Sequence, residues 1–190
     1  MLARWSMGNS INRVKFSEED VYRRSSFYEQ LVEHVFVSEV LQEAWYYFRE
    51  TVEVLRSEVD ASGYDVVFEC NGVLRHVQLK TSKLDAKASG QKVNMALAAK
   101  PGGCIVWLVR HEDHQTCRMR LSYRYFGGAP GECLPSLQGL KVARHTKANA
   151  LGVKAERSAI RVVPKSRFEN VPSTRELVVR LFGLSDPGSH

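Results

Sequence analysis

Apolar positions along the chain predict an order of helices and strands. From residue 25 to 49 they lie on most sides of a helical wheel, which predicts a long and well-buried helix. Residues 51–58 are predicted to be a first strand, and 104–109, the continuous apolar run CIVWLV, a strand buried on both faces. A short helix is predicted over 91–100, ended by the Pro-Gly-Gly at 101–103.

The strongest local signal lies between these strands, in residues 63–82 (GYDVVFECNGVLRHVQLKTS). Asn71-Gly72 predicts a two-residue hairpin turn, because both central residues of a type I′ turn need a positive φ. Counting outward from that turn puts Asp65 opposite Gln78, with Lys80 on the same face. A carboxylate, an amide oxygen and an ammonium group would then meet at one end of the hairpin. The alternative is the ordinary polar outer face of a half-exposed hairpin.

Beyond residue 110 the apolar pattern is weaker. Residues 111–114 are predicted to form an exposed turn, whereas 118–125 and 159–163 are predicted to be strands. A capping box at 173–176 opens a last helix, which Gly183 closes. The predicted core order is therefore helix, strand, strand, strand, helix, strand.

Basic residues exceed acidic ones by 27 to 21, and the formal charge of +6 favours polyanionic partners. The excess gathers in residues 141–167, where Glu156 is the single acid. Basic side chains spread through such a segment suit contacts with phosphates, and a solvated face is the alternative. The predicted nucleic-acid-binding residues are Lys141, Arg144, Lys147, Lys154, Arg157, Arg161, Lys165 and Arg167.

Cysteine usage and hydropathy bear on the compartment. The four cysteines are widely spaced and form no CxxC pair, which argues against a zinc site. No signal peptide is evident, and no apolar stretch approaches the roughly 20 residues that span a bilayer. We therefore expect a cytoplasmic protein without a membrane partner.

Two pairs of glutamates lie four residues apart on the long predicted helix, so each pair shares one helix face. An inward-pointing glutamate needs a partner or a metal, because burying an unpaired carboxylate is costly. Glu29 and Glu33 are candidates for such a role. For Glu39 and Glu43 a solvated acidic stripe is the favoured interpretation.

This order of elements, with Asp65 at the second strand and Gln-x-Lys at 78–80 on the third, resembles the PD-(D/E)XK nuclease superfamily. More closely, the chain is similar to a bacterial branch with a Q-x-K variant of the motif. The likeness covers about residues 29–109. It implies an α/β fold with a restriction endonuclease-like core, in which helices flank a mixed central sheet. Residues 1–190 would form one domain, with a core over about 25–110 and a basic C-terminal elaboration over 111–190.

The resemblance implies a Mg²⁺- or Mn²⁺-dependent endonuclease that hydrolyses phosphodiester bonds in DNA, in bacterial defence or DNA repair. Asp65, Gln78 and the backbone carbonyl of Leu79 would ligate the metal. Glu33 of the first helix, or Glu29 in its place, would complete the metal site. By analogy, such a nuclease could act as a homodimer.

In the same pattern Lys80 would orient the attacking water or neutralise the developing negative charge. Gln78 departs from the Asp or Glu of the signature, because an amide oxygen can ligate Mg²⁺ but brings no charge. The alternative is therefore a catalytically inert module that binds nucleic acid, or a subunit of a defence complex.

Overall fold

The computed structural model describes residues 17–56, 63–113, 115–145 and 155–187. Contacts divide the chain into two compact units, residues 1–34 and 35–190. The first unit holds α1 (Glu18–Arg23), whose N-cap Ser17 forms a capping box with Asp20. It also holds the start of α2 (Ser25–Glu43), which ends in the second unit and continues as a π-helix, η1 (Ala44–Phe48). The predicted long helix is thus confirmed.

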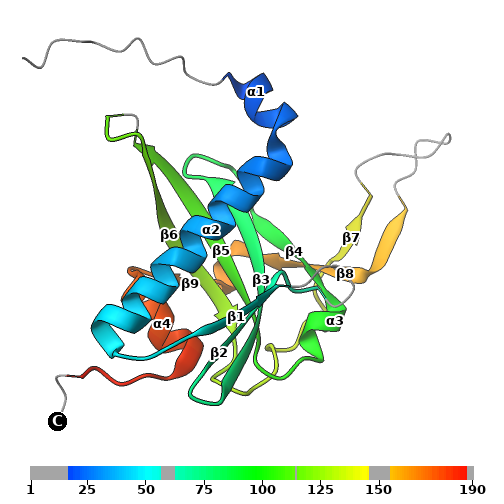
Figure 1. Ribbon diagram of the computed structural model, residues 1–190. Helices are drawn as coiled ribbons and strands as arrows, with labels where there is room; N and C mark the ends of the chain where they lie inside the picture. The colour runs from blue at the N-terminus through cyan, green and yellow to red at the C-terminus, as the bar shows by residue number, and fades with distance from the viewer. Residues whose placement is uncertain (1–16, 57–62, 114, 146–154, 188–190) are drawn as a thin grey trace, which may run out of the picture. The chain divides into compact units, whose positions relative to one another are not determined.

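A six-stranded mixed sheet forms the centre of the second unit (Figure 1), with strand order β1-β2-β3-β5-β6-β9. Neighbouring strands are antiparallel except β3 and β5, which run parallel. The strands are β1 (Glu53–Arg56), β2 (Val66–Cys70), β3 (Val73–Lys83), β5 (Gly103–Asp113), β6 (Arg118–Gly127) and β9 (Glu169–Val171). The protein is therefore a mixed α/β protein in which the predicted hairpin supplies two central strands.

The crossover from β3 to β5 contains more than the predicted helix. Gly90–Asn94 form a strand, β4, and only Met95–Ala98 form a helix, α3. The helix prediction for 91–94 was wrong because β4 pairs with β8 (Glu156–Pro164), which lies far beyond the reach of a local signal, since Gln91 pairs with Val163. With β7 (Val142–Arg144), these strands make a three-stranded sheet of order β4-β8-β7 (Figure 1).

One face of the six-stranded sheet, here called the helix face, packs against helices. It carries Val66, Phe68, Val77, Cys104, Val106, Leu108, Tyr123 and Tyr125, all buried. Phe36 of α2 stacks edge-on against Phe68 at 5.9 Å between ring centroids. Phe182 of α4 (Thr174–Phe182) contacts the same Phe68 ring at 6.3 Å.

The opposite face, here called the site face, carries Gln78, Lys80, Ser82, Ile105, Trp107, Val109, Ser122, Arg124 and Phe126. Part of it is covered by β4, α3 and β8, whose buried Val93, Leu97 and Val163 belong to one apolar cluster with Ile105 and Trp107. The strand 104–109 is accordingly buried on both faces, as predicted.

The C-terminal third departs from expectation in two places. The predicted exposed turn at 111–114 is wrong for His111, Glu112 and Asp113, which finish β5 and pair with β6. The segment 111–190 is also partly core, because β6 and β9 extend the six-stranded sheet. The last helix is confirmed: Ser173 Oγ accepts a hydrogen bond from the Glu176 backbone N–H, and Gly183 ends the helix with φ of 71°.

Glu39 and Glu43 are not a solvated stripe. The carboxylate of half-buried Glu39 accepts a hydrogen bond from Tyr123, whose oxygen also lies 3.0 Å from Thr174 Oγ1. Glu43 pairs with Arg175 of α4 at 2.7 Å. Both carboxylates have partners because α4, which carries Thr174 and Arg175, packs beside this end of α2. In the described part of the chain, no helix combines the length and apolarity that crossing a membrane requires.

Candidate active site and an adjoining pocket

The hairpin has the register that its turn predicts. Asn71 and Gly72 adopt φ values of 50° and 78°, as a type I′ turn requires. Glu69 stabilises the turn, because its Oε1 accepts a hydrogen bond from the Gly72 backbone N–H at 2.6 Å. Val66 lies opposite Val77, and the pairing continues to the turn without a bulge. The positions on each face therefore follow the prediction.

Asp65 lies in the bend that leads into β2. Its backbone N–H donates to Val77 O at 2.9 Å, which extends the hairpin by one position. Its carboxylate Oδ2 accepts the backbone N–H of Leu79 at 2.6 Å. A side chain that directly precedes β2 is thus tied to the backbone between Gln78 and Lys80. This bond holds the carboxylate beside the Gln-x-Lys segment.

Gln78 and Lys80 continue rows of side chains across the site face. Gln78 lies in register with Ile105 of β5, and its side chain is only 4% exposed. Its Oε1 is buried and accepts no hydrogen bond from the described residues. Buried polar atoms are usually paired, so this oxygen needs an explanation in terms of what it binds. Lys80 is half-buried and lies in register with Trp107.

The donor atoms at this end of the hairpin are oxygens, the type of ligand that Mg²⁺ prefers. Among the described residues, no group of three or more His, Cys, Asp and Glu side chains comes together as a metal site. Mg²⁺, however, is commonly bound through one or two carboxylates, with water and substrate phosphate oxygens in the other positions. Asp65 supplies one carboxylate and Gln78 an amide oxygen without a hydrogen-bond partner among the described residues. Leu79 as a carbonyl ligand stays a prediction; its observed contact is through its N–H.

The predicted helix ligands belong to the first unit. Glu33 is half-buried and Glu29 exposed on α2, and both stay predictions as metal ligands. The part of α2 that belongs to the second unit, from Val35 on, packs on the helix face through Phe36 and Glu39. That face is the one opposite Gln78 and Lys80.

The predicted basic segment is spread over β7, β8 and η2 (Lys165–Arg167). Lys147 and Lys154 lie outside the described residues. The others are exposed except Arg161, which is half-buried and donates to Ser158 O at 2.6 Å. Within the described residues, only Arg144 of this group meets a carboxylate, Glu156 at 3.7 Å. Positive charge on this segment is therefore mostly uncompensated.

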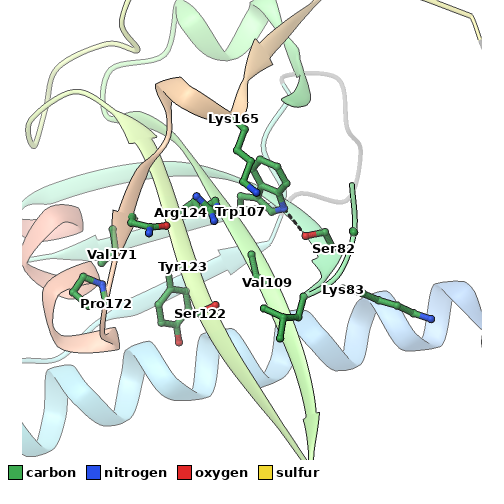
Figure 2. A pocket seen from close by; sticks show the side chains of 13 residues that line it. Ser82, Lys83, Trp107, Val109, Ser122, Tyr123, Arg124, Lys165, Val171 and Pro172 are labelled. Atoms are coloured by element: carbon green, nitrogen blue, oxygen red, sulfur yellow. Dashed lines mark hydrogen bonds between the residues drawn. The ribbon is translucent and has the colours of Figure 1, made fainter. Parts of the chain in front are cut away.

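A pocket of about 320 Å³ adjoins the candidate site on the same face (Figure 2). Ser82, two residues beyond Lys80 on β3, accepts a hydrogen bond from Trp107 Nε1 at 2.9 Å. The Arg124 guanidinium lies 5.9 Å from the Trp107 ring centroid. Lys165, from the predicted basic segment, lines the pocket from the other side. The pocket thus joins the strand of the Gln-x-Lys motif to the basic segment.

The sequence did not predict the pocket residues Ser82, Trp107 and Arg124. Alternation along 118–125 indicates that Ser122 and Arg124 share a face, and alternation along β3 does the same for Lys80 and Ser82. Only the parallel register of β3 with β5 brings these faces together, with Lys80 level with Trp107. Nothing in the local pattern specifies that register.

The titratable groups on the helix face form hydrogen bonds that connect elements of the fold. Burial raises the pKa of the Glu39 carboxyl, and the hydrogen bond from Tyr123 lowers it again in part. Burial, and then the bond to Glu39, raises the pKa of Tyr123. Arg75 is fully buried, and it donates to Tyr125 and to Ala129 O at 2.9 Å. These bonds tie β3 and β6 to the turn that follows β6.

Comparisons with known proteins add no relative. No protein-family model matches the chain, and neither a curated protein nor a solved structure matches it. The architecture and the side-chain geometry therefore carry the functional argument.

Proposed function

We propose that this protein is a metal-dependent nuclease that hydrolyses phosphodiester bonds in DNA. One observation carries the proposal: Asp65 is bound to the backbone of Leu79, between Gln78 and Lys80. An acidic group, an amide oxygen and an ammonium-bearing side chain thus come from two adjacent strands. These are the groups that the Q-x-K variant of the PD-(D/E)XK motif uses.

The order of elements supports the same proposal. A helix, three antiparallel strands, a crossover with a short helix, and a strand parallel to the third follow one another as α2, β1, β2, β3, α3 and β5. This is the order expected of a restriction endonuclease-like core. The strand β4 and its three-stranded sheet would then be an addition to that core, and they bring the basic β7 and β8 to it.

Each residue has a role that follows from its position. Asp65 is oriented by the Leu79 N–H beside the Gln-x-Lys segment, in which Gln78 carries the buried amide oxygen. Together they would hold a divalent cation, which supplies an activated water and stabilises charge on the phosphate. Lys80 would bind a phosphate oxygen on the same face and stabilise the negative charge that develops there. The exposed cations of the basic segment would contact the DNA backbone.

A second function is favoured by Gln78. With Asp65 as the one carboxylate at this end of the hairpin, affinity for a metal would be low, because the amide adds no charge. A nucleic-acid-binding module without catalysis would keep the basic segment and lose the chemistry. Its affinity for duplex DNA would still decrease as the salt concentration rises. The slope of log affinity against log salt concentration would become shallower by about 0.9 for each phosphate contact that a substitution removes.

Cleavage assays with charge-matched variants test the proposal. We expect the protein to cut linear or branched DNA with Mg²⁺ or Mn²⁺ and not with EDTA. Asp65→Asn should abolish cutting while the fold is kept, because the amide oxygen can still accept the Leu79 N–H. Lys80→Met should also abolish it, whereas Lys92→Met, which removes an exposed lysine from β4, should cut normally.

The outcomes separate the two functions. Cutting that survives both Asp65→Asn and Lys80→Met would refute the assignment of this site. If no cutting is seen but DNA binding decreases steeply with salt, the inert module is supported, and Gln78→Glu is the substitution to test for restored activity.

A further inference from the structure

The pocket beside Trp107 has an unbalanced set of charges. Among the described residues, its lining contains Arg124, Lys165 and Lys83 and no aspartate or glutamate. In Figure 2, the Lys165 side chain extends toward Trp107, whereas the ammonium end of Lys83 points away. Neither Arg124 nor Lys165 pairs with a carboxylate among the described residues. Two uncompensated cations that line one hollow create a positive potential that attracts an anion.

Neutral groups around these cations can also recognise oxygen atoms. Ser82 Oγ accepts the Trp107 Nε1 hydrogen, so its own hydroxyl hydrogen remains to be donated. The amide of exposed Asn170 adds donors on the side of β9. Arginine binds phosphate through two parallel hydrogen bonds, and lysine binds it as a point charge. Phosphate is the anion that this combination of donors suits.

The size and walls of the pocket indicate what the phosphate is attached to. A volume of about 320 Å³ is at the lower end of the range of about 300–1,000 Å³ for small-molecule sites. Val109, Val171 and Pro172 give it apolar walls beside the cations. The pocket therefore has room for one nucleotide-sized group that carries a charged end and an apolar side.

We propose that this pocket binds the phosphate of a nucleotide-sized phosphate monoester through Arg124 and Lys165. The monoester is either a free mononucleotide or the terminal nucleotide of a strand. Binding here is independent of the proposed cleavage, because no metal and none of Asp65, Gln78 and Lys80 takes part. A failure of the nuclease assay would leave it standing.

Titration calorimetry in EDTA at fixed ionic strength tests this site with matched probes. The free-nucleotide arm compares adenosine 5′-monophosphate with adenosine, and the strand arm compares a short single-stranded DNA with and without a 5′-phosphate. We expect the phosphorylated member of at least one pair to bind about tenfold more tightly or better, as a charge-assisted contact to phosphate requires. The arm that shows the preference identifies the source of the phosphate.

Variants locate the binding. Lys165→Ala and Arg124→Gln should each remove most of the preference for the phosphorylated probe. Lys92→Ala removes an exposed lysine of β4 that does not line the pocket and does not belong to the basic segment, and it should leave the preference unchanged. Circular dichroism and thermal unfolding of each variant establish that it is folded before binding is compared.

Two results would overturn the proposal. One is equal affinity for the phosphorylated and unphosphorylated members of both pairs in the wild-type protein. The other is an equal loss of preference in Lys165→Ala and Lys92→Ala, which would mean that the positive charge of the whole protein, and not the pocket, attracts the probe.

Discussion

Replacing Gln78 by glutamate places a carboxylate where the structure has a buried amide oxygen that no described residue hydrogen-bonds. The side chain at this position is 4% exposed, so the introduced charge would lose nearly all its water. In proteins this costs several kcal/mol after relaxation. Lys80 lies two residues along the same face, about 7 Å away by strand geometry. At an effective dielectric constant of about 20, it returns about 2 kcal/mol.

The expected net effect in EDTA is a destabilisation of at least about 2 kcal/mol, because the Asp65 carboxylate beside the same segment also repels the introduced charge. For a domain of this size, each kcal/mol changes Tm by about 2–4 °C, so Tm should fall by about 4–8 °C. Excess Mg²⁺ at about 100 times its Kd would return about 2.7 kcal/mol and restore Tm. The wild-type protein, which lacks the extra charge, should respond less to the metal.

The pH dependence of this variant has a definite sign. Burial raises the pKa of the introduced carboxyl above its unfolded value of about 4.3. The deficit in stability is therefore complete at pH values above the raised pKa, and it disappears as the pH falls toward the unfolded value. Scanning calorimetry at neutral and acid pH, with EDTA or Mg²⁺, measures both effects.

Gln138→Glu is the matched control, because Gln138 is exposed and the change in charge is the same. Its Tm should move little, since surface substitutions usually change stability by less than about 0.5 kcal/mol. Equal stability of the two variants in EDTA would refute the buried environment derived for Gln78. A destabilised Gln78→Glu whose Tm ignores Mg²⁺ would refute this position as a metal ligand.

Three further substitutions test the scaffold by urea or thermal unfolding. Arg75→Ala empties a fully buried site and leaves carbonyl oxygens without their donor, so the free energy of unfolding should fall by at least about 2 kcal/mol. A loss as small as that of an exposed residue would contradict the role of the Arg75 hydrogen bonds in holding β3 to β6 and the turn after it. Gly102→Ala should cost about 1–2 kcal/mol for its φ of 68° alone, and more because its Cβ would lie 2.1 Å from Leu74 O; unchanged unfolding would refute this close approach. Glu39→Gln should raise Tm at neutral pH, because the raised pKa of Glu39 means that its charged form is costly in the folded state. That gain should shrink at acid pH as Glu39 takes up its proton, and a gain independent of pH would contradict the reasoning.

Local chemistry in the sequence determined the hairpin and the ends of several elements. Asn71-Gly72 requires positive φ at both positions, which specifies the turn, and the turn specifies every cross-strand pair back to Val66–Val77. The last helix followed in the same way from Ser173 and Gly183, whose side chain and backbone satisfy the helix ends. Each of these signals acts within a few residues, so the sequence alone carries it.

Strand pairings between distant segments were decided only by the tertiary structure. Residues 91–94 became β4 because β8 pairs with them, and a helical pattern of alanines in the neighbouring residues gave no sign of that partner. The glutamates of α2 found Tyr123 and Arg175 for the same reason, since β6 and α4 are brought to them by the sheet. Long-range pairing depends on the combined packing of both faces, and no local pattern encodes it.

The candidate site divides along the same line. The sequence determined that Asp65, Gln78 and Lys80 share one end of the hairpin, because a two-residue turn leaves only one register. Only the parallel pairing of β3 with β5 placed Trp107 and Arg124 level with Lys80, and only the crossing of η2 brought Lys165 to the same pocket. A hairpin is closed by its own turn, whereas a parallel pair is joined by a long crossover that leaves its register to tertiary packing.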